Sequence, residues 1–147
     1  MGNRTGALVL WDKFFDESLA VIFVTEFRRA KIPVRLVGLR REQLAGRYGL
    51  TLYPDIGLRE AIDMATYTNC VVIPCELPGL KRIERDPRIY RLLDRANANN
   101  AQFVLNQSNP NTNGEPSILI DYMDKVTIFP ERTQIMLFAQ SIICNLI

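Results

Sequence analysis

The sequence contains no histidine among its 147 residues. Without an imidazole, the chain cannot build a Ser-His or Cys-His catalytic pair, a histidine-ligated metal site or a histidine-based pH switch. Function classes that depend on these groups are therefore excluded before any motif is considered.

Cysteine is also scarce. Cys70, Cys75 and Cys144 are an odd number of thiols without CxxC spacing, so neither a disulfide framework nor a zinc site is indicated. We predict free thiols and a reducing compartment.

A large charge of one sign and a long hydrophobic run are both missing. The 18 Lys and Arg residues nearly balance 16 Asp and Glu residues, giving a net charge of +2 that does not point to nucleic acid or an anionic membrane. Residues 1–11 lack the features of a signal peptide, and Gly6 stands where a myristoylation motif needs Ser or Thr. The apolar segment 135–147 is shorter than the ~20 residues that span a bilayer. These absences predict a cytoplasmic protein with no membrane partner.

The residues that are present predict one α/β domain over 1–147. A content of 48% hydrophobic and 23% charged residues is ordinary for a globular domain. Apolar runs predict buried strands, and apolar residues at i, i+3 and i+4 predict amphipathic helices. The predicted strands are 7–11, 34–39, 50–55, 69–74 and 101–106, followed by a hairpin or bent strand from 117–121 and 125–129. The predicted helices are 15–30, 58–65, one that begins at Asp86 and Pro87, and one from about residue 131 onward.

This alternation of strands and helices predicts a mostly parallel, doubly wound sheet, whose ligands bind beyond the carboxyl ends of the strands. Asn106, Gln107 and Ser108 follow the strand at 101–106. Gln107 and Ser108 could hydrogen-bond a polar ligand, or they could form a simple turn, since 106–114 is rich in Asn, Ser, Pro and Gly. The turn is the simpler interpretation.

Two other strands also end in candidate residues. Asp12 and Glu76 could together bind a cation or a cationic ligand, or each could be a helix cap or a solvated acid. Cys75 could be a reactive thiol, but the carboxylate of Glu76 beside it raises a thiol pKa rather than lowering it. Packing at a strand end is therefore the simpler interpretation of Cys75. Cys70 and Cys144 lie in apolar runs and are expected in the core.

A basic stretch at 81–95 holds six Lys and Arg residues with Tyr90 between them, and as one helix it could bind phosphate or nucleic acid. Glu84, Asp86 and Asp94 interrupt it, which favours a solvated helix face and disfavours a nucleic-acid partner. The last helix has apolar residues on more faces than a surface helix can bury. It therefore either lies centrally or forms a protein interface.

Three stretches, at 7–39, 49–61 and 69–110, resemble the ThiJ/PfpI family of the class I glutamine amidotransferase-like superfamily. Within them, RRAKIPV and YPDIGLREA are the more specific parts. The resemblance implies a flavodoxin-like three-layer sandwich. It also implies a cysteine on a strained elbow, activated by an acid and often a histidine, beside an oxyanion hole built partly on glycines. Family members are commonly dimers, so a homodimer or another protein partner is implied.

The chain departs from this pattern at every catalytic component. The elbow cysteine falls on Gln107, or with one residue of slip on Asn106 or Ser108, and none of these is a thiol. The family's acid falls on Leu19, although Asp16 and Glu17 lie just before it.

The remaining departures concern the oxyanion hole, the histidine and the chain length. The glycine pair is replaced by Cys75 and Glu76, no histidine is available, and 109–117 replaces a longer segment of the family. The ancestral activity is therefore expected to be absent.

The leading hypothesis is a catalytically inactive ThiJ/PfpI-like protein, a pseudoenzyme that serves as a binding, regulatory or oligomerisation module without a cofactor or metal. A small polar ligand could bind in a vestigial pocket formed by Asp12, Glu17, Cys75, Glu76, Asn106, Gln107 and Ser108. One alternative is a hydrolase, lyase or redox enzyme rebuilt around Cys75, Glu76 and Asp12. A second alternative is nucleic-acid binding through the basic helix at 81–95.

Overall fold

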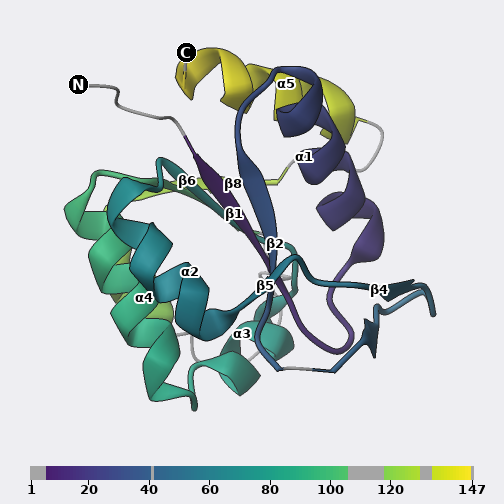
Figure 1. The fold of residues 1–147 in the computed structure, drawn as a ribbon, viewed down its shortest axis with the longest axis vertical. Coiled ribbons are helices and arrows are strands. Elements are labelled where there is room, and N and C mark those ends of the chain that lie inside the picture. Colours follow the sequence, from purple (N-terminus) through teal and green to yellow (C-terminus); the bar gives the residue numbers. More distant parts are fainter. Residues whose placement is uncertain (1–5, 41, 106–117, 130–133, 147) are drawn as a thin grey trace.

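A computed structural model describes residues 6–40, 42–105, 118–129 and 134–146 of the chain. Six parallel strands form one sheet in the order β5-β2-β1-β6-β7-β8 (Figure 1). Their bounds are β1 (Ala7–Trp11), β2 (Val34–Gly38), β5 (Ile56–Gly57), β6 (Cys70–Ile73), β7 (Gln102–Leu105) and β8 (Lys125–Ile128). A separate antiparallel pair, β3 (Leu44–Ala45) and β4 (Thr51–Leu52), forms the β3–β4 hairpin.

Helices cover both faces of the sheet, which confirms the predicted α/β three-layer sandwich. Helices α1 (Glu17–Arg29) and α5 (Ile135–Leu146) lie on one face, and α2 (Leu58–Met64) and α4 (Pro87–Ala98) on the other (Figure 1). A 3-10 helix at Ala65–Tyr67 continues α2, and the short helix α3 (Leu77–Ile83) lies at the carboxyl end of the sheet. No helix within the described ranges is long and apolar enough to cross a membrane.

The core follows directly from the apolar patterns of the sequence. All five residues of β1 are buried because the strand is central and covered on both faces. In α4, Ile89, Leu92, Leu93 and Ala96 are fully buried at the i, i+3, i+4, i+7 spacing of one helix face. Phe23 of α1 is also fully buried, and its ring lies edge-on to Phe138 of α5 at a centroid distance of 6.1 Å. The two helices on this face therefore share one aromatic cluster.

Local capping starts two of the helices. The Asp16 carboxylate accepts hydrogen bonds from the backbone N–H groups of Ser18 and Leu19, so α1 begins at Glu17. Asp86 accepts from the N–H of Arg88 in the same way, and Pro87 occupies the first position of α4, as the sequence predicts.

The prediction of a hairpin or bent strand at 117–121 and 125–129 is wrong. Residues Ile118–Tyr122 form a 3-10 helix, while β8 pairs in parallel with β7, Gln102 opposite Lys125. Parallel pairing requires the chain to cross back before β8, and the 3-10 helix lies in that crossing. The apolar residues of 117–121 are typical of a strand, but they do not indicate in which direction β8 runs.

The basic stretch at 81–95 is not one helix. Helix α3 ends at Ile83, Asp86 caps the next helix, and Pro87 begins α4. A proline within a continuous helix would remove a backbone hydrogen bond and clash with the preceding turn, so the two parts are separate. Residues 50–55, predicted as one strand, contribute only β4 to the hairpin, and its partner β3 lies where no strand is predicted.

Candidate functional site

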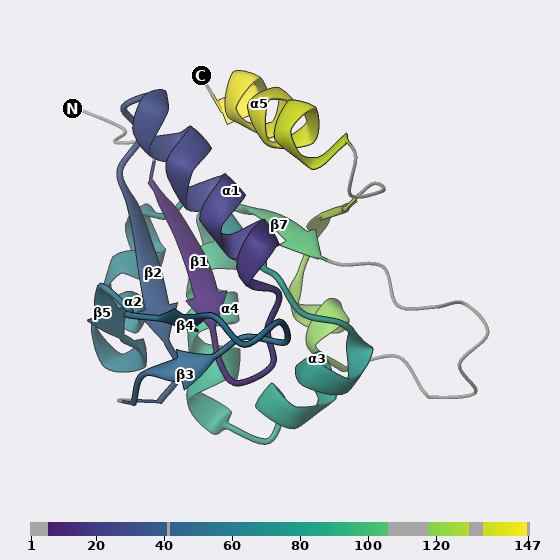
Figure 2. The ribbon, with the colours of Figure 1, turned by 90° about the vertical axis from the view of Figure 1, so that its right-hand side faces the viewer.

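A crevice of about 370 Å³ lies beyond the carboxyl ends of β1 and β6. Figure 2 shows the β3–β4 hairpin and α3 at this same end of the sheet, below the arrowhead of β1. The position is the one at which a doubly wound sheet binds ligands. The lining residues are Phe14, Asp16, Arg47, Cys75, Glu76, Pro78, Gly79 and Arg82.

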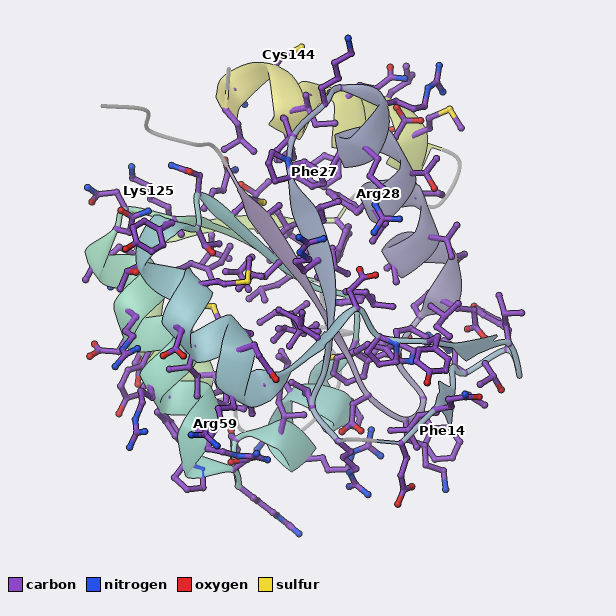
Figure 3. The ribbon with its side chains drawn as sticks, in the orientation of Figure 1. Phe14, Phe27, Arg28, Arg59, Lys125 and Cys144 are labelled. Atoms are coloured by element: carbon purple, nitrogen blue, oxygen red, sulfur yellow. The ribbon has the colours of Figure 1, made fainter. Side chains whose placement is uncertain are left out.

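The loop between β1 and α1 is held by backbone hydrogen bonds at the crevice mouth. Phe14 has a left-handed backbone with φ of 66° and donates its N–H to Ala45 O at 3.2 Å. Asp16 N donates to Pro74 O at 2.7 Å, which ties this loop to the end of β6. A left-handed conformation is unfavourable for a non-glycine residue, and here it turns the Phe14 ring outward, 58% exposed, beside the hairpin (Figure 3).

An ion pair spans the crevice between the hairpin and the start of α3. Arg47 Nη1 lies 2.6 Å from Glu76 Oε1, with both side chains partly exposed. The hydrogen bond to Glu76 raises the pKa of the Arg47 guanidinium. The Arg47 guanidinium also lies 5.3 Å from the centroid of the Tyr48 ring, a cation–π distance.

Asp12 follows β1 directly, is 3% exposed and is not among the residues that line the crevice. Its carboxylate oxygens lie 3.5 Å from Arg40 Nε and 4.0 Å from Arg82 Nε. Arg82 in turn donates from Nη2 to the backbone carbonyl of Lys13. Within the described part of the chain, Asp12 Oδ1 and Arg82 Nε have no hydrogen-bond partner. Asp12 and Glu76 therefore each face arginines, which gives no support to their hypothetical pairing as a cation site.

Cys75 is 3% exposed, and burial raises the pKa of its thiol well above the ordinary range. Arg82 opposes this shift, while Asp12 and Glu76 add to it. A Cβ on Gly79 would lie 2.9 Å from Cys75 Cβ, so α3 packs tightly against this residue. The thiol is therefore protonated near neutral pH, which is the state expected of a packed residue and not of a nucleophile.

Glu17 does not line the crevice. Its buried carboxylate accepts hydrogen bonds from the backbone N–H of Tyr48 at 3.0 Å and of Leu50 at 2.8 Å, and so holds the hairpin against α1. A Cβ on Gly46 would lie 2.5 Å from this carboxylate. The sequence predicts Glu17 as part of a vestigial pocket, and no local signal in the sequence indicates its long-range contact with the hairpin.

A second hollow, of about 540 Å³, lies between α1 and the hairpin, and we call it the hairpin face. Val21, Tyr48 and Leu50 are each 42–54% exposed there although their side chains are large and largely apolar. Its complete lining is Glu17, Ser18, Val21, Ile22, Tyr48 and Leu50.

Of the remaining predicted residues, Asn106, Gln107 and Ser108 lie outside the described residues. Cys70 is fully buried, as predicted, and burial raises its thiol pKa to about 12. The prediction that Cys144 lies in the core is wrong, because this residue is exposed on the outer side of α5 (Figure 3).

Three of the basic residues of 81–95 make separate local contacts. Arg82 belongs to the crevice, whereas Arg88 pairs with Asp86 at 2.7 Å and Arg95 with Asp63 at 3.6 Å. Among the described residues there is no group of three or more His, Cys, Asp or Glu side chains that could hold a metal ion.

Sequence reasoning missed Arg47, which lines the crevice, and Arg40, which pairs with the buried Asp12. Arg47 lies between β3 and β4 and reaches the crevice because the hairpin folds over the end of β1. The GRYG sequence around Arg47 is a turn signal, but it does not indicate what the arginine contacts.

Comparison with known proteins identifies the fold. No family model and no curated protein matches the sequence. Among solved structures, the chain is similar to oxidised DJ-1 of Toxoplasma gondii, with a TM-score of 0.74 and 16% identity over 97% of this chain and 90% of that one. It is similar to DJ-1beta of Drosophila melanogaster with a TM-score of 0.72 and 18% identity, again over 97% and 90% of the two chains.

A third similar structure is a two-domain protein of Anabaena variabilis that contains DJ-1/ThiJ/PfpI-like and ferritin-like domains. The TM-score is 0.70 at 18% identity, and the match covers 97% of this chain but 48% of that one. This chain therefore spans about half the length of the two-domain protein. The likenesses establish a DJ-1/ThiJ/PfpI-like fold, in agreement with the resemblance seen in the sequence.

Proposed function

We propose that this chain, which has the DJ-1/ThiJ/PfpI-like fold, is a catalytically inactive domain that binds a small polar ligand in the crevice without covalent chemistry. The observation that carries the proposal is the state of Cys75, whose buried thiol has a raised pKa and sits tightly against α3. The sequence has no histidine to activate a nucleophile, and no cysteine between residues 76 and 143. These features support binding in preference to turnover.

The lining of the crevice suggests the chemistry of the ligand. Arg47 and Glu76 present charges of both signs at the mouth, and the exposed Phe14 ring offers an aromatic surface beside them. A small molecule that carries both hydrogen-bond donors and acceptors could contact Arg47 and Glu76 together.

The proposal is tested by two measurements on the purified chain. We expect no turnover above buffer with methylglyoxal or with a peptide substrate. We also expect at least one member of a library of small carboxylates, amino acids and amides to raise the melting temperature, and the affinity of that compound to fall tenfold or more in Arg47→Ala. Turnover that is abolished in Cys75→Ser but retained in Cys144→Ser would refute inactivity and favour the rebuilt enzyme around Cys75, Glu76 and Asp12.

A second function, self-association, is supported by the hairpin face. Exposed Val21, Tyr48 and Leu50 gather on one surface, and among the described residues that line it the one carboxylate, Glu17, already accepts backbone hydrogen bonds. A two-fold dimer brings the same patch of each copy together, and an apolar patch without free charge can contact itself without repulsion. We propose that a second copy of this chain covers the hairpin face.

Sedimentation velocity tests this assembly. We expect a dimer that Leu50→Lys converts to a monomer, while Leu137→Lys, a substitution at an exposed apolar residue of α5, leaves it intact. A wild-type chain that remains monomeric at all concentrations would remove this function. If Leu137→Lys dissociates the dimer and Leu50→Lys does not, the interface lies on α5 instead.

The proposal places the protein in the cytoplasm, supported by the three free cysteines, which suit a reducing compartment. Nucleic-acid binding through 81–95 has little support, because the stretch is divided between α3 and α4 and several of its arginines pair with acids. If the chain does not bind nucleic acid even at low salt, this alternative is excluded.

A further inference from the structure

The β3–β4 hairpin carries residues of both the crevice and the hairpin face. Arg47 lines the crevice, and the next residue, Tyr48, lines the hairpin face together with Leu50. The Arg47 guanidinium lies 5.3 Å from the Tyr48 ring centroid, so these neighbouring side chains are in contact although they serve different surfaces. A residue of the crevice and a residue of the hairpin face are therefore in direct side-chain contact.

Most contacts that hold the hairpin come from one segment, the end of β1 and the start of α1. Trp11 Nε1 donates to Leu44 O at 3.1 Å, Phe14 N donates to Ala45 O, and Arg47 N donates to Phe15 O at 3.0 Å. The Glu17 carboxylate accepts from the Tyr48 and Leu50 N–H groups on the same side. The hairpin is thus anchored to α1 but adds no strand to the main sheet.

The Arg47–Glu76 ion pair is the contact that crosses from the tip of the hairpin to the opposite wall of the crevice. Glu76 is the residue directly before α3, so the pair connects the hairpin to the segment between β6 and α3. A polar ligand in the crevice competes with one member of this pair for the other, because both side chains line the cavity.

We propose that the β3–β4 hairpin couples the crevice to the hairpin face, so that opening the Arg47–Glu76 ion pair weakens self-association of the chain. The inference rests on the proposed self-association and adds its regulation: ligand occupancy of the crevice changes the monomer–dimer equilibrium. The Glu17 anchor keeps the hairpin in place, so the effect is an adjustment of Tyr48 and Leu50 and not their release. Because the ion pair is partly exposed, we expect a two- to fivefold change.

The experiment compares Glu76→Gln with a matched control, Asp63→Asn, which removes a surface carboxylate that pairs with Arg95 away from the hairpin. Hydrogen exchange of the Tyr48 and Leu50 amides reports the hairpin, and sedimentation velocity reports the dimer Kd. We expect Glu76→Gln to raise both the exchange rates and the Kd two- to fivefold, and Asp63→Asn to change neither.

Each outcome decides a separate point. Unchanged amide exchange in Glu76→Gln overturns the role of the ion pair, and faster exchange with an unchanged Kd overturns the coupling. A wild-type chain that is monomeric overturns the self-association on which the inference rests. This outcome is distinct from a dimer whose Kd is unchanged in Glu76→Gln, which overturns only the coupling. Equal effects of Glu76→Gln and Asp63→Asn would show a general effect of surface charge and would also overturn the proposal.

Discussion

The Oε2 atom of Glu17 lies 2.8 Å from the backbone nitrogen of Leu50 and accepts its hydrogen bond. These residues are 33 positions apart, and the contact joins the first turn of α1 to the β3–β4 hairpin. Because Glu17 is 4% exposed, water does not substitute for the N–H groups that it binds. The hairpin, and with it Arg47 at the crevice, is therefore positioned by an acid outside the crevice.

Replacing Glu17 with Gln should destabilise the fold by about 1–3 kcal/mol, because the charge is lost and one of the two acceptor oxygens becomes a donor. Urea unfolding measures the free energy. Glu42→Gln, a substitution at an exposed acid, is the control and should stay within about 0.5 kcal/mol of the wild type. Equal stability of the two variants would show that Glu17 does not anchor the hairpin.

Gly46→Ala should also destabilise the protein, by about 1–3 kcal/mol, because its new Cβ would lie 2.5 Å from the Glu17 carboxylate. Gly6→Ala is a suitable control, since the nearest atom to its new Cβ would lie 3.7 Å away. Thermal unfolding of the two variants gives the comparison. If Gly46→Ala melts at the wild-type temperature, the Glu17 carboxylate does not lie as close to Gly46 as the structure places it.

Alkaline pH should weaken the fold through its two buried thiols. Burial raises the Cys70 pKa to about 12 and raises the Cys75 pKa as well, whereas an unfolded thiol titrates near about 8.5. Below that pH both states keep the proton and the full stability is present. Above it only the unfolded state loses the proton, so stability falls by about 1.4 kcal/mol per pH unit for each thiol.

Urea titrations at pH 8 and pH 10 measure this slope. Between these two pH values, Cys70→Ala should lose less unfolding free energy than the wild type. Cys144→Ala should lose as much as the wild type, because Cys144 is exposed. Parallel slopes in all three proteins would contradict the assignment of the effect to buried thiols.

Alkylation should distinguish the three cysteines. At pH 8 we expect iodoacetamide to modify Cys144 at least tenfold faster than Cys75 or Cys70, because only Cys144 is exposed and the other two thiols remain protonated. Peptide mass spectrometry over time gives the three rates. Modification of Cys75 as fast as that of Cys144 would favour the alternative in which Cys75 is reactive.

Much of the fold could be predicted because its signals are local. The apolar run at 7–11, the helix spacing of Ile89 and Leu92, and the cap at Asp86 each depend on near neighbours in the chain. The direction of β8 could not be predicted, since parallel and antiparallel strands can have the same apolar pattern. Cys144 was misplaced because an apolar helix gives no indication of which face remains uncovered.

By itself, the sequence determined the chemistry that the chain lacks. With no histidine, and with no cysteine at or near the position of Gln107, a histidine-assisted nucleophile at this corner is excluded whatever the fold. Composition and periodicity also determined a parallel α/β architecture, because burial on both faces of a central strand demands a continuous apolar run.

Only the tertiary structure decided which side chains meet at the end of that sheet. Arg47 and Glu76 are 29 residues apart, and Arg82 and Lys13 are 69 residues apart, so no local pattern relates them. The structure also decided the state of Cys75, because its pKa depends on how completely α3 excludes water from the thiol. Long-range packing, and not residue type, therefore separates a buried structural cysteine from a reactive one in this protein.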